Sequence, residues 1–288
     1  MIKVDGHSHI GKDYHHGECN IESYVEYLKK INIDIGLVMP NPNPIYNVQG
    51  IFVRPNLKEK NPYKYINETL ANQTSNYKNL YFIPYLHPCM DDEHYLNEYY
   101  DKYKPIAYKV HGIGSRIGPD DVKSEIIDFI KRKDLPLIIH TDCPRKFEKY
   151  ELQRLREKNK AIFWCYFLIK NNIKGTLNHG VLYDKNVFDL VNNFENIRVA
   201  LGPDKIVSSK DSVTINKIKG NYLTDIQKYL DIDKMIFDID YNWNIVNEDE
   251  DLDIVKRYKE SFKYLDYDKV IGKNALKFYN IHYNKGGD

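Results

Sequence analysis

The sequence contains few cysteines, and their spacing does not suit a zinc knuckle or a disulfide framework. The four cysteines, Cys19, Cys89, Cys143 and Cys165, are widely separated and include no Cys-x-x-Cys pair. That spacing argues against a metal site built from thiolates and against a small domain held together by disulfides. We therefore expect free, reduced thiols.

Two further absences restrict the function. No apolar run approaches the roughly 20 residues that a membrane-spanning helix requires, and the first residues enter a polar strand end without a signal peptide. The 42 basic and 41 acidic residues leave a net charge of +1, so no overall field favours nucleic acid or an anionic membrane. We expect a cytoplasmic protein that acts on a small molecule, without nucleic-acid or membrane partners.

The length and composition indicate a globular enzyme-sized chain. A chain of 288 residues with 42% hydrophobic residues can bury a full core and has the length of one large α/β barrel or two small domains. No internal repeat, low-complexity tract or linker divides it, so we expect one domain over residues 1–288.

Predicted strands and helices alternate along the whole chain. Apolar runs predict strands at residues 2–9, 34–39, 80–86, 106–110, 135–139, 174–178, 197–201 and 235–239. Helical spacing predicts helices at residues 21–31, 61–77, 91–103, 120–133, 151–171, 184–192, 222–230, 252–264 and 268–279. Residues 40–60 and 202–220 show no period and are predicted to be loops over a site. The alternation predicts an α/β fold, a (β/α)8 TIM barrel with C-terminal helices.

A pair of histidines, His7 and His9, lies at the end of the first predicted strand. Side chains alternate along a strand, so residues two apart leave on the same face. Two neutral imidazoles suit Zn²⁺ or a neighbouring divalent metal, which needs three or four ligands. An isolated His-x-His pair can also occur by chance on a protein surface, so the metal-site interpretation depends on further ligands elsewhere in the chain.

Four more polar residues lie at the ends of later predicted strands: Lys109, His140, His179 and Asp240. In a closed barrel the carboxyl ends of the strands surround one pocket, so these residues are expected to meet the histidine pair. Each also has a structural interpretation. The two histidines could be hydrogen-bonded core residues, the aspartate a cap, and the lysine the partner of a nearby carboxylate.

Two arginines are candidates for binding a substrate anion. Arg54 and Arg116 lie in loops predicted to follow the second and fourth strands, on the side of the pocket. A guanidinium group can hold a carboxylate or phosphate through two parallel hydrogen bonds, although loop arginines are usually only solvated. The histidines interpreted as structural or loop residues are His15, His16, His87 and His111.

Six segments, taken in order, carry a resemblance to a known superfamily. They are VDGHSH (4–9), YKVH (108–111), IIHTD (138–142), LNHG (177–180), IFDIDY (236–241) and IGKNAL (271–276). With them the chain resembles the amidohydrolase superfamily of metal-dependent hydrolases, and within it the branch that includes aminocarboxymuconate-semialdehyde decarboxylase. The sequence departs from that family at residues 237–239, where a glycine and a small residue usually precede the aspartate. The bulk there affects the expected shape of the pocket.

The resemblance implies a metal-ligand set and a role for each remaining residue. The ligands implied are His7, His9, His140 and Asp240. His179 is then a further ligand or an acid–base group that faces the substrate. Lys109 is either carboxylated, bridging two ions with His179 as a further ligand, or a cation directed at the substrate.

These assignments predict an enzyme with one or two Zn²⁺ ions or other divalent metals. Zinc lowers the pKa of a bound water from about 15.7 to about 7, which makes hydroxide available at neutral pH. Asp240 would take the proton from the water, and His179 would bind the substrate oxygen or protonate the leaving group. The leading hypothesis is hydrolysis of an amide, lactone or ester of a small polar molecule. The alternatives are non-oxidative decarboxylation of an unsaturated or aromatic acid, and a barrel that binds without turnover; a homodimer is also expected.

Overall fold

Parallel strands and helices alternate through the computed structural model, as the sequence predicts. The structure describes residues 1–13, 17–41, 60–142, 149–179, 184–202, 222–241, 252–262 and 266–283. The two predicted loops over the site, including Arg54, lie outside these residues except at their edges, as do His15 and His16. No described helix is both long enough and apolar enough to cross a membrane.

The strands are β1 (Val4–Asp13), β2 (Gly17–Cys19), β3 (Ile35–Pro40), β4 (Leu80–Phe82), β5 (Tyr108–His111), β6 (Leu137–His140), β7 (Gly175–Asn178), β8 (Ile197–Leu201) and β9 (Met235–Phe237). The α-helices are α1 (Ile21–Lys30), α2 (Lys64–Thr74), α3 (Glu93–Tyr103), α4 (Gly112–Ser115), α5 (Ser124–Lys133), α6 (Tyr150–Lys158), α7 (Ala161–Asn171), α8 (Lys185–Asn193), α9 (Tyr222–Ile226), α11 (Ile254–Ser261) and α12 (Asn274–Phe278). Short 3-10 turns, η2 (Pro119–Asp121) and η5 (Ile232–Lys234), and a π-helical turn, η6 (Lys269–Lys273), complete the described elements.

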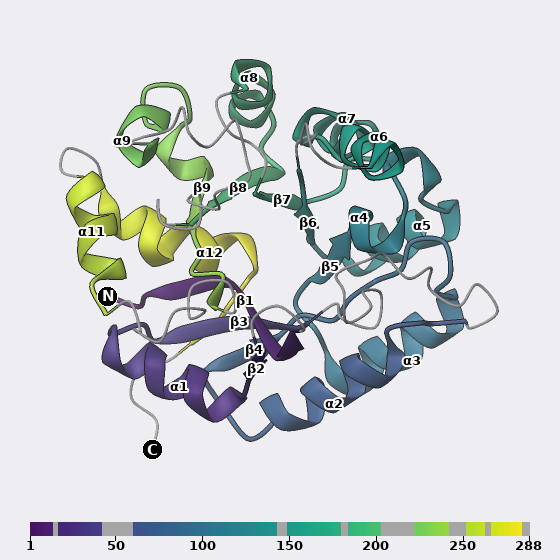
Figure 1. Cartoon of the computed structure of the whole chain (residues 1–288), viewed down its shortest axis with the longest axis horizontal. Coiled ribbons are helices and arrows are strands. Elements are labelled where there is room, and N and C mark those ends of the chain that lie inside the picture. The colour runs from purple at the N-terminus through teal and green to yellow at the C-terminus, as the bar shows by residue number, and fades with distance from the viewer. Residues whose placement is uncertain are drawn as a thin grey trace.

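The strands stand around a common centre and the helices surround them (Figure 1). Their ladders form two sheets, in the orders β2-β1-β3-β4 and β5-β6-β7-β8-β9, and every pair except β1–β2 is parallel. The predicted α/β fold is confirmed. Within the described residues, however, the ladders leave two seams and do not form one continuous ring.

Individual hydrogen bonds cross both seams. At the seam between β4 and β5, Tyr85 and Lys109 form an isolated parallel bridge, with the amide of Lys109 donating to the carbonyl of Pro84 at 2.8 Å. Pro84 has no amide proton, so the β4 ladder stops early and the predicted strand 80–86 is shortened. At the seam between β9 and β1, the amide of Asp240 donates to the carbonyl of His7 at 2.9 Å.

Alternate positions of each strand face two different cores. In β3, Ile35, Leu37 and Met39 belong to the core inside the ring of strands, whereas Val38 packs with the core under the helices. The inner core is small, and polar groups such as Lys109 are buried beside it. The period of two therefore places some polar side chains inside the molecule, where only a hydrogen-bonded or charged partner can offset their lost hydration.

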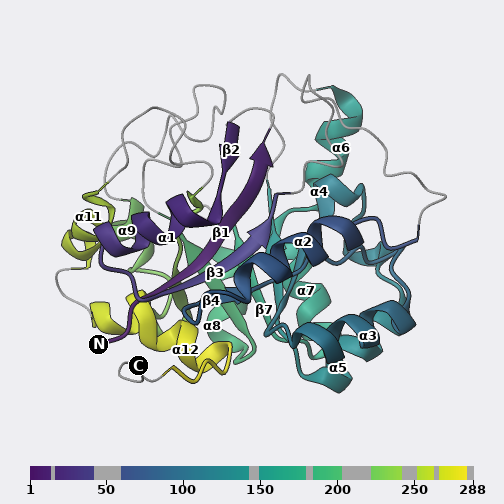
Figure 2. The same ribbon diagram turned by 90° about the horizontal axis from the view of Figure 1, so that it is seen from below.

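The segment around α12 closes one end of the ring. The Asn274 side chain donates to the carbonyls of Ile232 (2.7 Å) and Met235 (2.8 Å). The hydroxyl groups of Tyr279 and Thr176 lie 2.7 Å apart. Figure 2 shows α12 and the N-terminus at this end, while β2 and α6 lie at the opposite end. The IGKNAL segment of the sequence therefore belongs to the closed end and not to the pocket.

Gly272 allows a very close approach of this segment to the first strand. A Cβ atom there would lie 2.0 Å from the carbonyl oxygen of Ile2. Because this oxygen belongs to the backbone, it can move away only if the strand itself shifts. We expect Gly272→Ala to lower the free energy of unfolding by about 1–3 kcal/mol through overpacking. The neighbouring Lys273→Ala, at an exposed side chain, should change it by less than about 0.5 kcal/mol. Urea unfolding of both variants tests this, and equal midpoints would contradict it.

Several predicted elements differ from the structure in their bounds, and two of these differences have a clear physical cause. The helix expected over residues 151–171 is wrong as a single element, because it is divided into α6 and α7 at Asn159. The buried Asn159 amide donates to the carbonyls of Ile117 and Leu155 and accepts from the indole of Trp164, so it fixes the break. The first strand was expected to end at His9 but continues to Asp13, because its last residues pair with β2.

Candidate metal centre

Three side chains from three strand ends bring possible metal-ligand atoms together. His7 comes from β1, His179 directly follows β7, and Asp240 lies three residues after β9. One ligand atom of each lies within 4.8 Å of the others. The strands thus collect residues separated by more than 200 positions of sequence, as the strand-end argument predicts.

The hydrogen bonding of these groups fits a cation. Nδ1 of His7 and Oδ1 of Asp240 are both buried, have no hydrogen-bond partner among the described residues, and lie 3.7 Å apart. Nε2 of His179 lies 3.8 Å from Oδ2 of Asp240. Two ligand atoms of a tetrahedral Zn²⁺ are about 3.4 Å apart, so both spacings are close to those around a shared ion. Buried polar atoms without partners are costly, and a bound cation would satisfy them.

Backbone conformation at the strand ends directs two of these side chains. His179 (φ 62°) and Asp240 (φ 50°) both adopt the left-handed conformation, which costs a non-glycine residue roughly 1–2 kcal/mol. Hydrogen bonds hold them in it. The Thr141 hydroxyl donates to the carbonyl of His179 at 2.6 Å, and the carbonyl of His7 accepts from the amide of Asp240. Strain of this kind concentrates at functional sites.

His9 lies beside His7 with its ring oriented by the backbone. The two ring centroids are 4.7 Å apart and the planes cross at 84°. Nδ1 of His9 lies 3.2 Å from the carbonyl oxygen of Pro40, at the end of β3. A carbonyl only accepts, so this contact places the ring proton on Nδ1. Nε2 is then the nitrogen with the lone pair, the usual arrangement for a metal-binding histidine.

Lys109 controls which nitrogen of His7 carries the proton. Its Nζ is fully buried and lies 2.9 Å from Nε2 of His7. As an ammonium it can only donate, which leaves the ring proton on Nδ1, towards Asp240. As a neutral amine it can accept from Nε2, so that Nδ1 offers a lone pair beside the Asp240 carboxylate. Burial lowers the pKa of Lys109 to about 7, so the neutral form is within reach.

His140 lies next to this group but outside the set of three donors. Its ring stacks on that of His111 at 4.0 Å and 10°, and its centroid is 4.7 Å from that of His179. Nε2 of His140 lies 3.6 Å from Oδ2 of Asp142. A carboxylate behind a histidine is a common way to orient a metal ligand. Nδ1 of His111 accepts from the amide of Gly114 at 3.0 Å, so this histidine caps α4.

The imidazoles of the site are held neutral. Burial lowers the pKa of His7 and of His140 well below the ordinary value, and it lowers the pKa of His179 to about 3. The charge of Lys109 acts in the same direction on all three. Neutral imidazole is the form that binds metal, so these rings need lose no proton on binding.

The carboxylate of Asp240 gives the site its expected pH dependence. Burial raises the pKa of Asp240 to about 7, so below pH 7 a proton competes with a cation for this group. We expect the apparent Zn²⁺ affinity to fall up to about tenfold for each pH unit below 7 and to level off above it. Zinc titrations at pH 6, 7 and 8 in non-coordinating buffers test this. An affinity that stays flat from pH 6 to 8 would contradict it.

Of the two predicted arginines, Arg116 lies within the described residues, after β5 as expected. Arg116 adopts φ 58° at the end of α4, and its Nη2 lies 3.7 Å from the Glu151 carboxylate, so it already has an acidic neighbour. Arg156, which the sequence analysis missed, is 9% exposed on α6 and pairs with Asp142, the residue beside His140. The positively charged Arg156 also helps to lower the pKa of His140. No local pattern indicates it, because Arg156 is one of several charged residues on a mostly polar helix.

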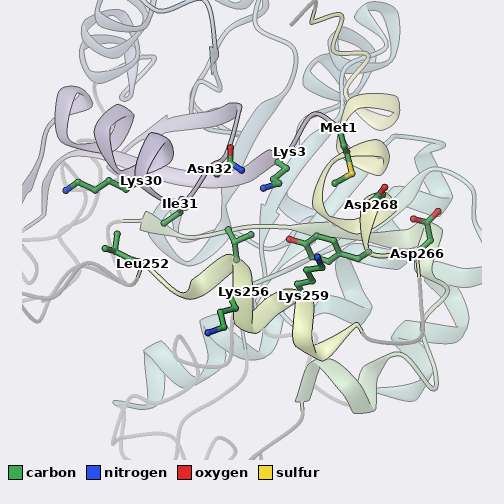
Figure 3. Close-up of a pocket in the computed structure, with 12 residues that line it drawn as sticks. Met1, Lys3, Lys30, Ile31, Asn32, Leu252, Lys256, Lys259, Asp266 and Asp268 are labelled. Atoms are coloured by element: carbon green, nitrogen blue, oxygen red, sulfur yellow. The ribbon is translucent and has the colours of Figure 1, made fainter.

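A separate pocket of about 640 Å³ lies at the other end of the first strand (Figure 3). It is lined by residues at the start of the chain and the end of α1, such as Lys3 and Asn32, and by α11 residues such as Lys256. Its lysines are opposed by Asp266 and Asp268. None of the candidate metal ligands lines it, so it is distinct from the metal centre.

Comparison with known proteins supports the fold. No protein-family model and no curated protein matches the sequence. Solved structures do match, among them the following three at probability 1.00. One is described as a probable 2-pyrone-4,6-dicarboxylic acid hydrolase from Acinetobacter baumannii (13% identity, 98% of this chain and 100% of that chain, TM-score 0.62). The second is an amidohydrolase from Burkholderia multivorans with bound zinc (10% identity, 98% and 100%, TM-score 0.62). The third is 5-carboxyvanillate decarboxylase from Sphingomonas paucimobilis (11% identity, 93% and 85%, TM-score 0.57).

These similarities show that the chain has the amidohydrolase fold, as the sequence resemblance implied. The structures that share it include hydrolases and a decarboxylase, one of them with zinc. In this chain the fold gathers a cluster of histidine and aspartate side chains that could hold a divalent metal.

Proposed function

We propose that this protein is a metal-dependent enzyme of the amidohydrolase superfamily that hydrolyses an amide, lactone or ester of a small polar molecule. The observation that carries the proposal is a pair of buried atoms, Nδ1 of His7 and Oδ1 of Asp240, which lie 3.7 Å apart at the strand ends and have no hydrogen-bond partner in the described part of the chain. The zinc-containing structure with the same fold supports it.

The proposed ligands are His7, His9, His140 and Asp240, which the sequence resemblance implies. A Zn²⁺-class ion held there would polarise the substrate carbonyl and lower the pKa of a bound water to near neutral. The neutral imidazoles and the oriented Nδ1–H of His9 match what such an ion requires of its ligands. His179 is the alternative to His140 as a ligand, since it belongs to the group of three donors and its Nε2 lies 3.8 Å from Oδ2 of Asp240.

In this proposal Asp240 handles the proton and His179 orients the substrate. Asp240 directs Oδ1 towards His7 and Oδ2 towards His179, so one oxygen can hold the ion while the other accepts a proton from the attacking water. A pKa of about 7 suits that exchange at neutral pH. The pKa of His179, near 3, keeps its ring neutral. It therefore orients the substrate oxygen by donating N–H, and Asp240 returns the proton to the leaving group.

A decarboxylase is the second candidate, because 5-carboxyvanillate decarboxylase has the same fold. Neutral His179 and buried Lys109 would then face the carboxylate that leaves. Arg116 and Arg54 are proposed to bind substrate anions in either reaction. The third candidate function is a barrel that binds metal without turning over a substrate.

The test uses metal content and two substrates. We expect the purified protein to bind Zn²⁺. After chelation and reconstitution with Zn²⁺, it should open the ring of a pyrone dicarboxylate, and the loss of the pyrone's ultraviolet absorbance measures this reaction. Release of carbon dioxide from carboxyvanillate without hydrolysis would support the decarboxylase. Bound zinc with neither activity would favour the binding barrel. One ion per chain leaves Lys109 as an amine, whereas two would indicate its carboxylation.

A further inference from the structure

The Asp5 carboxylate is completely buried and is the centre of a hydrogen-bond network that the proposed chemistry does not use. Its Oδ1 accepts from the amides of His7 (3.2 Å) and Ile239 (2.9 Å). Its Oδ2 accepts from the hydroxyls of Ser8 and Tyr24, both at 2.5 Å. Four donors from three separate parts of the chain therefore meet on one side chain.

This network lies at the seam between β9 and β1, where the two sheets are not joined by a regular ladder. The pairing of β1 with β3 shifts register between Asp5 and Ser8, so the first strand is irregular here. Gly6 lets β9 come close, since a Cβ atom there would lie 2.7 Å from Ile236 Cγ2. Asp5 Oδ1 accepts the amide of Ile239 in the way that a strand carbonyl would, and so completes the seam.

The donors that Asp5 holds are the backbone groups next to the proposed ligands. Two of its partners are the amide of His7 itself and the amide of the residue before Asp240. The Ser8 hydroxyl, which donates to Asp5, accepts from the amide of Tyr241, the residue after Asp240. The network therefore forms hydrogen bonds with the residues on both sides of Asp240 and with the backbone of His7.

We propose that Asp5 is a positioning residue that sets the spacing between His7 and Asp240, and so the affinity of the metal centre. The role rests on the proposed function, because it presumes that these two side chains bind one cation. Asp240 adopts the left-handed conformation (φ 50°), which a non-glycine residue keeps only where the surrounding structure holds it. Residues that orient ligands typically change metal affinity 10–100-fold when they are lost.

Tyr24 supports Asp5 from behind and allows a mild test. It is a fully buried residue of α1, its ring packs 5.0 Å from that of Tyr241, and its hydroxyl contacts the carboxylate. Tyr24→Phe removes one of the four hydrogen bonds and keeps the packing. Asp5→Asn keeps the shape but replaces one acceptor oxygen with a donor, so it opposes two of the four donors.

A matched control exists at the closed end of the ring. Tyr279 is also a buried tyrosine whose hydroxyl makes one hydrogen bond, to Thr176 at 2.7 Å. Tyr279→Phe should therefore also lower the melting temperature by the loss of one buried hydrogen bond, as Tyr24→Phe does. It touches none of the proposed ligands.

The experiment titrates Zn²⁺ into the full chain by competition with a chelator, and records the visible spectrum of the Co²⁺ form. We expect Zn²⁺ affinity to fall about 10–100-fold in Asp5→Asn and up to about tenfold in Tyr24→Phe, with a shifted Co²⁺ spectrum in both. Tyr279→Phe should keep wild-type affinity and spectrum. If Asp5→Asn does not fold, the comparison of Zn²⁺ affinity and Co²⁺ spectrum between Tyr24→Phe and Tyr279→Phe tests the proposal.

Two outcomes would overturn the proposal in different ways. Wild-type Zn²⁺ affinity and spectrum in Tyr24→Phe, with the same loss of melting temperature as in Tyr279→Phe, would show that the network only stabilises the fold. The proposed function would then stand. A wild-type protein that binds neither Zn²⁺ nor Co²⁺ would contradict the proposed function, and the positioning role with it.

Discussion

Asp240→Asn is expected to abolish activity. The substitution removes the charge that holds the ion and the oxygen that accepts the proton, so we expect kcat/KM to fall by roughly 10⁴-fold, the upper range for a proton-transfer group. The amide is also a weaker ligand, so zinc content should fall below that of the wild type. Steady-state kinetics and metal analysis of the same preparation measure both effects.

Stability should change in the opposite direction. Burial raises the pKa of Asp240, which means that the folded protein disfavours its carboxylate relative to water. Above pH 7 the metal-free Asp240→Asn protein should therefore melt at the same temperature as the wild type or higher. A variant that lost activity because it unfolded would melt lower, and that result would contradict the assignment.

Asp238 provides the matched control. It is a second buried carboxylate two residues earlier, and its Oδ2 accepts from the Asn178 amide at 3.4 Å. It lies outside the group of three donors. We expect Asp238→Asn to retain zinc. Equal loss of zinc in both variants would show that the chain uses a different carboxylate from the one proposed.

His140→Ala and His179→Ala are expected to separate metal binding from orientation of the substrate. The two rings are neighbours, 4.7 Å apart, and both are held neutral by burial. His140 has Asp142 behind it, as a metal ligand commonly does, so His140→Ala should lose zinc and activity together. His179→Ala should keep zinc and lose about 10²–10⁴-fold in turnover.

Zinc content, turnover and the pH profile are measured for both variants. Loss of zinc from His179→Ala, with zinc retained in His140→Ala, would exchange the two roles and make the group of three donors the metal site. Because both substitutions leave a cavity of similar size, a comparison of their melting temperatures without metal controls for packing.

Periodicity was sufficient to predict most of the elements. The strand at residues 197–201 agrees with β8, and α1 and α3 end within one residue of their predicted ends. The helix predicted over residues 151–171 failed because no proline or glycine marks a break near Asn159, although the mostly polar α6 gives way there to the mostly apolar α7. A polar side chain that bonds to a distant carbonyl, here that of Ile117, breaks a helix without leaving a local signal.

The site was predictable in part for the same reason. His7, His179 and Asp240 stand at strand ends, so topology alone predicts that they converge. Arg156 and the network around Asp5 could not be found in this way, because their partners lie in other elements. The proposed roles of His9, His140 and Lys109 remain predictions of the sequence, which the structure supplements with distances and protonation states.

The sequence by itself determined which chemical groups are available and that alternating strands and helices bring them to one end of a ring. Side-chain period and strand length are local properties, so they can be read from neighbouring residues. Only the tertiary structure decided which atoms face each other: Nδ1 of His7 towards Asp240, Lys109 on the opposite nitrogen, and Asp5 between the strands. Those choices depend on hydrogen bonds between residues far apart in the chain, and on burial, which fixes the charge of each group.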